Sequence, residues 1–193
     1  MSVAVADRFR LEIGERNRSL VIVAVTSFLA AFGLVAYAVL GIEGAEGEFF
    51  PTQAVTSAKG GYALEAPAAW TGDKQGKVTT LSSPAKDVVV TIGPAPRGNL
   101  ADAGRVIFDS VADTYSKVTF MGATEQKVDG REAIMFSAKA TNEADVRLRF
   151  VGVTFTDAGR NYSMTAFTPE DSNAERVLPR IETILNTFTA TKK

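Results

Sequence analysis

The segment EQKVDGREAIMFSAKAT, residues 125–141, contains the clearest structural signal in this chain. Its Asp129–Gly130 pair is one of the residue combinations most favourable for the two-residue turn of a β-hairpin. Apolar and β-forming residues flank the pair on both sides, as they do in paired strands. The segment therefore predicts two antiparallel strands joined at this turn, and with them an antiparallel sheet.

The neighbouring segments extend this pattern in both directions. Residues 144–167 contain two more strand patterns, joined by an Asp-Ala-Gly turn at 157–159. Three shorter strand patterns lie upstream, at 61–67, 77–83 and 86–93, with turn-forming residues between them. Together these segments predict about six or seven strands.

Two helical patterns complete the domain. Asn99 is a favourable N-cap for a helix whose apolar stripe extends over residues 100–118. Gly104 lies inside this pattern, where it costs about 1 kcal/mol relative to Ala. A second apolar stripe occupies residues 177–188 and contains Pro179. Because proline is unfavourable in a helix interior, we expect the last helix to restart there, with Pro179 in its first turn.

The order of elements is strands, helix, strands, helix. This order predicts an α+β fold in which an antiparallel sheet of about six or seven strands is flanked by helices. The predicted domain covers residues 60–193, which is long enough to form a hydrophobic core of its own.

One of the strand patterns carries two arginines on the same face. Arg147 and Arg149 alternate with Leu148 and Phe150, but Val151 then falls on the face of the arginines. Either a β-bulge or a strand covered on both faces explains this change of phase. The two arginines are candidates for contact with a partner, and a solvated strand end is the alternative interpretation.

Residues 19–41, SLVIVAVTSFLAAFGLVAYAVLG, contain no charged residue. As a helix they would span about 34 Å, enough to cross a hydrocarbon core of about 30 Å. Arginines precede this segment and glutamates follow it closely, so the positive-inside bias predicts a cytoplasmic N-terminus. We expect a cytoplasmic tail at 1–18, a transmembrane helix at 19–41 and a single-pass protein of the plasma membrane with an extracytoplasmic C-terminal domain.

A cleaved signal peptide is the alternative interpretation of the same segment. Ala36 and Ala38 form an A-x-A sequence of the kind that signal peptidase cuts. The apolar run is longer than a usual signal core of about 7–15 residues and no polar spacer precedes the cut, which favours the anchor. In the anchor, Ala24, Ser27, Ala31 and Ala38 form a candidate helix-packing stripe, and the abundance of alanine is the alternative explanation for it.

Residues 42–59 are rich in glycine and small polar residues, and they are predicted to form a linker. Phe49 and Phe50 are conspicuous within it. They are candidates for contact with the membrane interface or with a partner, the alternative being that they pack against the edge of the domain itself.

The composition narrows the classes of function. The chain has 193 residues, and neither histidine nor cysteine is among them. This excludes disulfides, thiolate chemistry and every catalytic arrangement that depends on imidazole. The net charge is −1, so the chain lacks the excess of positive charge that binding to nucleic acid requires. We therefore expect no enzyme, no catalytic residues, no cofactor, no metal site and no nucleic-acid partner.

Four segments resemble the PsbP-like family over roughly residues 60–190. They are a first strand ending in proline and then tryptophan (YALEAPAAW), the midpoint segment VDGREAIMF, a late strand with tyrosine (NYSMTAF) and a terminal helix that finishes ILNTFTA. The resemblance implies an α-β-α sandwich and a non-enzymatic role, because members of this family commonly stabilise or help assemble a larger membrane complex. Bacterial relatives often carry a lipid-anchoring cysteine, which this chain lacks, so that the predicted transmembrane helix would replace it.

Two functional hypotheses follow. The first is a non-enzymatic accessory subunit of a larger plasma-membrane complex, with an energy-transducing or respiratory complex as the candidate. Its partners would be other integral membrane proteins of that complex and the lipid bilayer. The second is a membrane-anchored envelope protein that binds a lipid, a glycan or another small ligand in an apolar cavity.

Overall fold

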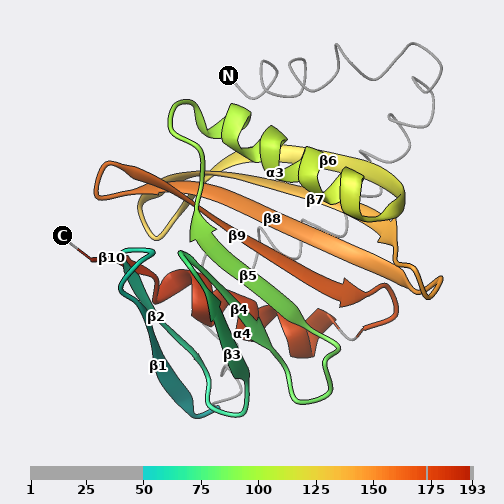
Figure 1. Cartoon of the computed structure of the whole chain (residues 1–193), viewed down its shortest axis with the longest axis horizontal. Coiled ribbons are helices and arrows are strands. Elements are labelled where there is room, and N and C mark those ends of the chain that lie inside the picture. The colour runs from blue at the N-terminus through green and yellow to red at the C-terminus, as the bar shows by residue number, and fades with distance from the viewer. Residues whose placement is uncertain (1–49, 173, 192–193) are drawn as a thin grey trace.

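The computed structural model describes residues 50–172 and 174–191 (Figure 1). Several of the predictions lie outside these residues: the tail at 1–18, the transmembrane helix at 19–41, the cleavage site and Phe49. The candidate helix-packing stripe lies outside them too, and it consists of Ala24, Ser27, Ala31 and Ala38. Neither helix in the described part of the chain is long and apolar enough to cross a membrane.

The larger sheet has seven antiparallel strands in the order β3-β4-β5-β9-β8-β7-β6. Its strands are β3 (Thr71–Gln75), β4 (Val78–Ser82), β5 (Val89–Pro94), β6 (Ser116–Val128), β7 (Arg131–Thr141), β8 (Arg147–Asp157) and β9 (Arg160–Pro169). Asp129 and Gly130 join β6 to β7 with φ values of 49° and 74°, which a two-residue hairpin turn of this kind requires. The predicted hairpin is confirmed.

A second sheet has three strands, β1 (Thr52–Ser57), β2 (Tyr62–Pro67) and β10 (Thr189–Ala190), in the order β1-β2-β10. This corrects two predictions. Residues 52–57 were expected in the linker at 42–59 but form β1, and β2 was expected in the same sheet as the other strands. The mostly polar β1 is a strand because it pairs with β2 along its whole length, a contact that its own sequence does not announce.

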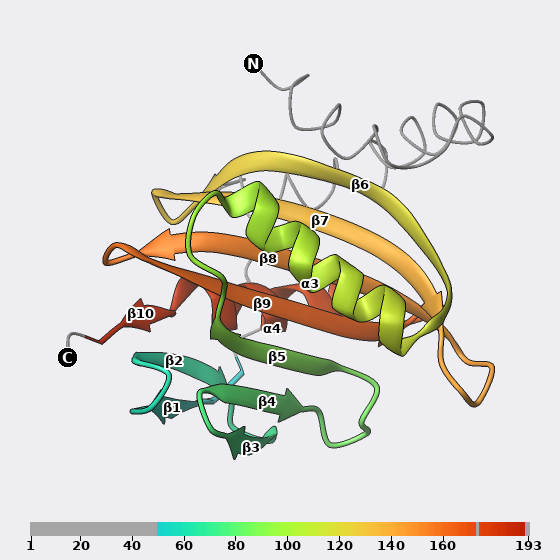
Figure 2. The ribbon, with the colours of Figure 1, turned by 45° about the horizontal axis from the view of Figure 1, so that its top comes forward.

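The helices lie on opposite faces of the large sheet (Figure 2). Helix α3 (Leu100–Thr114) covers one face, while α4 (Ala174–Asn186) and the three-stranded sheet cover the other. Each face therefore has its own apolar core. The smaller core lies under α3 and includes Val111, Phe136, Ala138 and Phe150. The larger one joins α4, both sheets and Trp70. The prediction of an antiparallel sheet flanked by helices is confirmed.

Strand β8 is buried on both faces, and this explains its change of phase. Its register with β9 is unbroken from Leu148 to Asp157, so no bulge is present there. Phe150 packs in the core under α3, whereas Val153 and Phe155 pack in the core under α4. A strand covered on both sides carries apolar residues in both phases.

Helix α3 begins where the sequence predicts and ends earlier. The Asn99 side-chain oxygen accepts a hydrogen bond of 2.7 Å from the Ala101 backbone N–H, which confirms the N-cap. The predicted stripe continued to residue 118, but Tyr115 is already extended and Val118 lies in β6. The Tyr115 ring instead packs on Phe167 of β9, with 5.1 Å between the ring centroids, and the chain turns away from the helix axis there.

Two glycines allow α3 to lie close to the sheet. Gly152 is the register partner of Phe136, and the ring of Phe136 lies across the space that a side chain at 152 would fill. Gly104 of α3 lies over the same ring, since a Cβ there would be 3.4 Å from it. Gly104 is unfavourable in an isolated helix, but here it leaves room for the Phe136 ring between α3 and the sheet.

Helix α4 continues through Pro179, which corrects the prediction that the helix restarts at this residue. Proline in a helix interior costs about 3 kcal/mol. The apolar stripe of α4 buries Ile181, Ile184 and Leu185 against the larger core, and each such side chain contributes about 1.5–3 kcal/mol. Burial of the stripe along one continuous axis therefore outweighs the missing hydrogen bond.

Replacing Gly152 by Ala is expected to destabilise the chain by about 1–3 kcal/mol, because the new Cβ would lie 2.4 Å from the Phe136 ring. Denaturant unfolding followed by circular dichroism measures this change. Adding Phe136→Leu to the variant should relieve part of the loss. Gly72→Ala is the matched control, since a Cβ there meets only Leu81, at 3.4 Å. Equal effects at positions 72 and 152 would contradict the packing described here.

Candidate functional site

Arg131, the arginine of the hairpin motif, is the most enclosed of the ion-paired basic side chains in the described part of the chain, with 12% of its side chain exposed. Its guanidinium donates hydrogen bonds to the carbonyl of Leu185, in the last turn of α4, at 3.1 Å, and to that of Phe188, just after the helix, at 3.0 Å. Helix α4 has no basic residue in its own last turn. Arg131 of β7 therefore supplies both the hydrogen bonds and the positive charge that stabilise a helix C-terminus.

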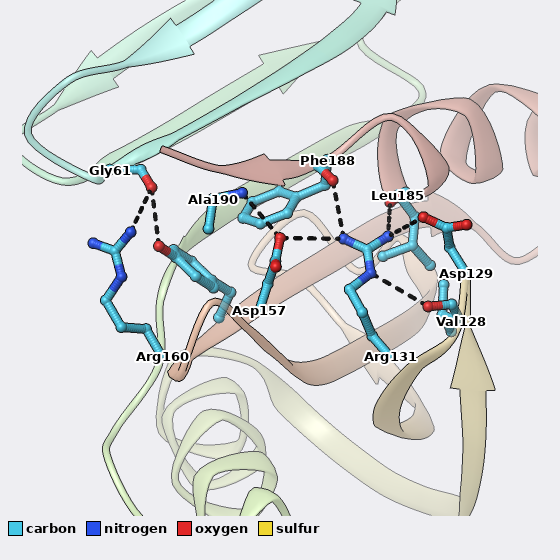
Figure 3. Close-up of polar contacts among 10 residues, drawn as sticks. Gly61, Val128, Asp129, Arg131, Asp157, Arg160, Leu185, Phe188 and Ala190 are labelled. Carbon is cyan, nitrogen blue, oxygen red and sulfur yellow. Dashed lines mark hydrogen bonds and ion pairs between the residues drawn. The ribbon is translucent and has the colours of Figure 1, made fainter. Parts of the chain in front are cut away.

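Asp157 and Arg160, which flank the turn between β8 and β9, extend this arrangement (Figure 3). Asp157 lies 3.7 Å from Arg131 and accepts a 2.9 Å hydrogen bond from the backbone N–H of Ala190 in β10. Arg160 donates to the carbonyls of Gly61 and Thr191, at 3.2 and 2.8 Å. We refer to Arg131, Asp157 and Arg160 as the polar clasp.

The polar clasp holds elements together. Its acceptors are backbone carbonyls of the β1–β2 turn, α4 and the C-terminal segment, and its cations also lie over aromatic rings. The polar groups of these three side chains are therefore used for contacts within the domain. The VDGRE motif is thus explained by structure, and we place the candidate functional residues elsewhere.

The predicted contact residues Arg147 and Arg149 gather around one carboxylate, Glu170, immediately after β9. Arg147 lies 3.7 Å from the Glu170 carboxylate, and Arg149 donates to the Glu170 backbone carbonyl at 3.3 Å. Lys139, the register partner of Arg149 on β7, forms an ion pair with the same carboxylate. We call these four residues the charged cluster.

The charged cluster lies at the surface. The Arg147 side chain is 82% exposed, and its neighbour Val146 is one of the large apolar side chains left exposed. Val146, Arg147, Glu170 and Asp171 line an open hollow of about 370 Å³. The hydrogen bond from Lys139, followed by the charges of the surrounding cations, holds the pKa of Glu170 below its usual range, although partial burial opposes this.

Sequence reasoning identified the two arginines and missed Lys139 and Glu170. No local signal links these residues, because 31 positions separate them and only the register of β7, β8 and β9 brings them together. Phe50, the other predicted contact in the described region, is half-buried and precedes β1. It therefore lies two residues before the three-stranded sheet, whereas the arginines lie at the start of β8.

A second candidate site is a cavity of about 50 Å³ between α4 and the large sheet. Its wall is mainly apolar, and Met135 and Met164 contribute thioethers to it. Glu182 of α4 also lines the cavity, and its Oε1 is enclosed without a hydrogen-bond partner in the described part of the chain. Burial raises the pKa of the Glu182 carboxyl. Within residues 50–172 and 174–191, no cluster of three or more potential metal ligands occurs.

The fold resembles solved structures although the sequence matches no protein-family model and no curated protein. The solution structure of cyanobacterial PsbP (CyanoP) from Synechocystis sp. PCC 6803 has a TM-score of 0.54 and 20% identity, covering 78% of this chain and 98% of that one. A Bacteroides thetaiotaomicron protein has a TM-score of 0.52 and 15% identity, covering 73% of this chain and 49% of that one. The described domain therefore has a PsbP-like fold.

Replacing Arg131 by Met should lower the free energy of unfolding by about 3 kcal/mol, because the carbonyls of Leu185 and Phe188 and the Asp157 carboxylate would lose a partially buried cation. Arg131→Lys should recover only part of this loss, since an ammonium group cannot reproduce the forked geometry. Denaturant titration measures both values. Arg97→Met, at an exposed position, is the control and should change stability by less than about 0.5 kcal/mol. A loss at position 131 no larger than at 97 would refute the role of the polar clasp.

Replacing Glu182 by Leu should stabilise the chain at pH 7 by about 1 kcal/mol, because an enclosed oxygen without a partner is unfavourable. With its pKa raised in the folded state, Glu182 favours unfolding once it ionises, so wild-type stability falls as pH rises from the ordinary carboxyl value through the raised one. The stability difference should therefore shrink toward pH 4. Thermal unfolding at both pH values tests this, with exposed Glu132→Leu as the control. A difference that does not depend on pH would contradict it.

Proposed function

We propose that this protein is a non-enzymatic accessory subunit that stabilises or helps assemble a larger plasma-membrane complex, with an energy-transducing or respiratory complex as the candidate. The observation that carries the proposal is a PsbP-like domain placed after an uninterrupted apolar segment at residues 19–41. That segment is long enough to act as a transmembrane anchor. An anchor and a folded domain on one side of the membrane suit a subunit that binds other integral membrane proteins and the bilayer.

The geometry of the domain supports a role in binding a partner. Arg131 and Asp157 already use their polar groups within the polar clasp, where Arg131 holds the end of α4 and Asp157 holds β10. The charged cluster, in contrast, presents Arg147 next to exposed Val146 over an open hollow. Arginine beside apolar surface is typical of residues that anchor protein interfaces.

The ligand-binding hypothesis remains the second candidate function. The observation that favours it is the cavity under α4, where an acceptor oxygen of Glu182 faces an apolar wall. Its volume of about 50 Å³ suits a small molecule or one end of a larger one. The two functions are compatible, because the cavity and the charged cluster use different residues.

The proposal is tested by extracting the full-length tagged chain from its native membranes in a mild detergent and isolating it by affinity. We expect it to be recovered with integral membrane subunits in a fixed ratio. Recovery alone, at the size of a monomer, would contradict the proposal. So would a mature chain that begins at Val39, because lateral packing of an anchor would then be excluded.

Reversing both arginines, with Arg147→Glu and Arg149→Glu, should reduce recovery of the partner subunits about tenfold, which corresponds to about 1.4 kcal/mol. The melting temperature should fall only slightly, because both side chains are exposed and the surface ion pairs lost with Glu170 contribute at most about 1 kcal/mol. The matched control reverses Lys74 and Arg97, two exposed cations away from the charged cluster. Equal recovery with both double variants would remove the charged cluster from the interface and leave the accessory role to be judged by the wild-type isolation.

A further inference from the structure

The cavity under α4 is enclosed by parts of five elements. Its floor consists of side chains from β6, β7, β8 and β9, and its roof is one face of α4. The apolar part of the wall includes Val128, Met135, Val153, Met164, Leu178 and Leu185. Asn186, which also lines it, is exposed, so this side of the cavity borders the solvent. The site is therefore an apolar chamber that reaches the surface near the C-terminal end of α4.

The polar groups of the chamber differ in whether they have a hydrogen-bond partner. Gln126 donates its amide N–H to the thioether sulfur of Met135, at 2.7 Å. Glu182 Oε1 is enclosed and accepts no hydrogen bond from any described residue. Ser137 Oγ is the other such atom, but it does not line the chamber. A buried acceptor without a donor is unfavourable by itself and becomes favourable when a bound group supplies the donor.

We propose that this chamber binds a small apolar molecule that carries a hydroxyl group, with the hydroxyl donating a hydrogen bond to Glu182 Oε1 and the alkyl part packing between Met135 and Met164. The inference deepens the ligand-binding alternative and does not depend on the accessory role. Such a ligand supplies a hydrogen-bond donor to Glu182 Oε1, and its alkyl part contacts the apolar wall.

The chemistry of the chamber distinguishes a hydroxyl from charged ligands. A carboxylate or phosphate would meet the negative charge of Glu182 inside an apolar wall. An ammonium group would form a buried ion pair, whose desolvation cancels much of the attraction. A neutral hydroxyl supplies one donor and requires little desolvation, and a carboxylate acceptor strengthens that bond.

The position of the chamber relative to the polar clasp explains how a ligand could enter. Arg131 fixes the C-terminal end of α4 through Leu185 and Phe188. Pro179, one residue after Leu178 of the roof, lacks the backbone N–H that would tie it to the preceding turn. Met135 and Met164 have flexible side chains that adapt to irregular shapes. A small displacement of the roof and these two side chains therefore admits a guest without breaking the clasp.

The test uses the full-length chain in neutral phospholipid nanodiscs, with methionine methyl groups labelled with ¹³C, and 2-propanol as the probe. Met135 and Met164 line the chamber, while Met121 lies on β6 outside it and is the internal control. We expect the signals of Met135 and Met164 to shift with a saturable dependence on 2-propanol while that of Met121 stays in place. Proportional, non-saturating shifts of all three signals would mean a solvent effect only and would overturn the proposal.

Glu182→Ala separates a hydrogen-bonding site from a simple void. This variant enlarges the chamber and removes the acceptor, so the apparent Kd for 2-propanol should rise at least fivefold. A Kd that is unchanged or lower would mean that volume alone governs binding, and the proposed role of Glu182 would be wrong. Glu132→Ala, an exposed carboxylate on β7, is the matched control and should leave the Kd unchanged.

Glu182→Gln guards against failure of the alanine variant to fold, which a displaced Met121 signal would reveal. The amide keeps a carbonyl acceptor and loses the charge that strengthens the bond, so the Kd should rise about threefold. An unchanged Kd in this variant would also overturn the proposal. These measurements require only the purified chain, so their outcome is independent of whether partner subunits are recovered in the affinity isolation.

Discussion

The structure depends on the guanidinium of Arg131, a residue of β7 that stabilises the C-terminal end of α4. Arg131 starts β7, immediately after the hairpin turn, and donates hydrogen bonds to the carbonyls of Leu185, at the end of α4, and Phe188, just after it, more than 50 residues later in the chain. The same side chain lies 5.2 Å from the Phe155 ring centroid and 5.9 Å from that of Phe188. Because α4 has no cation of its own in its last turn, this contact sets where the helix stops and where Phe188 enters the core.

The order of the layers follows from this contact. Once the end of α4 is fixed, the chain continues into β10, which Asp157 and Arg160 hold against β2. This closes the three-stranded sheet and completes the layer that α4 begins. The Phe188 ring stacks on the Tyr62 ring, with 5.3 Å between the ring centroids, and this contact links the segment after α4 to β2. The polar clasp therefore connects the β1–β2 turn to the last strand of the described domain.

The candidate sites occupy positions that this arrangement leaves open. The charged cluster lies where β7, β8 and the end of β9 meet, and the chamber lies under the C-terminal half of α4. Arg147 and Arg149 were identifiable as an exposed pair because they interrupt an apolar strand. Glu182 was not identifiable, since a glutamate on an amphipathic helix is ordinarily solvated. Glu182 is enclosed because α4 packs over β6 and β7, and the hydrophobic periodicity of the helix does not reveal this packing.

The division between local and tertiary information is consistent along the chain. Local sequence determined the Asp129–Gly130 hairpin, the Asn99 cap and most strands of the large sheet, because turn chemistry, capping and side-chain alternation act over a few residues. Tertiary structure alone decided that 52–57 is a strand, that α4 passes through Pro179, and that β2 belongs to a second sheet. In each of these cases pairing or burial with a distant segment outweighs a local preference of a few kcal/mol.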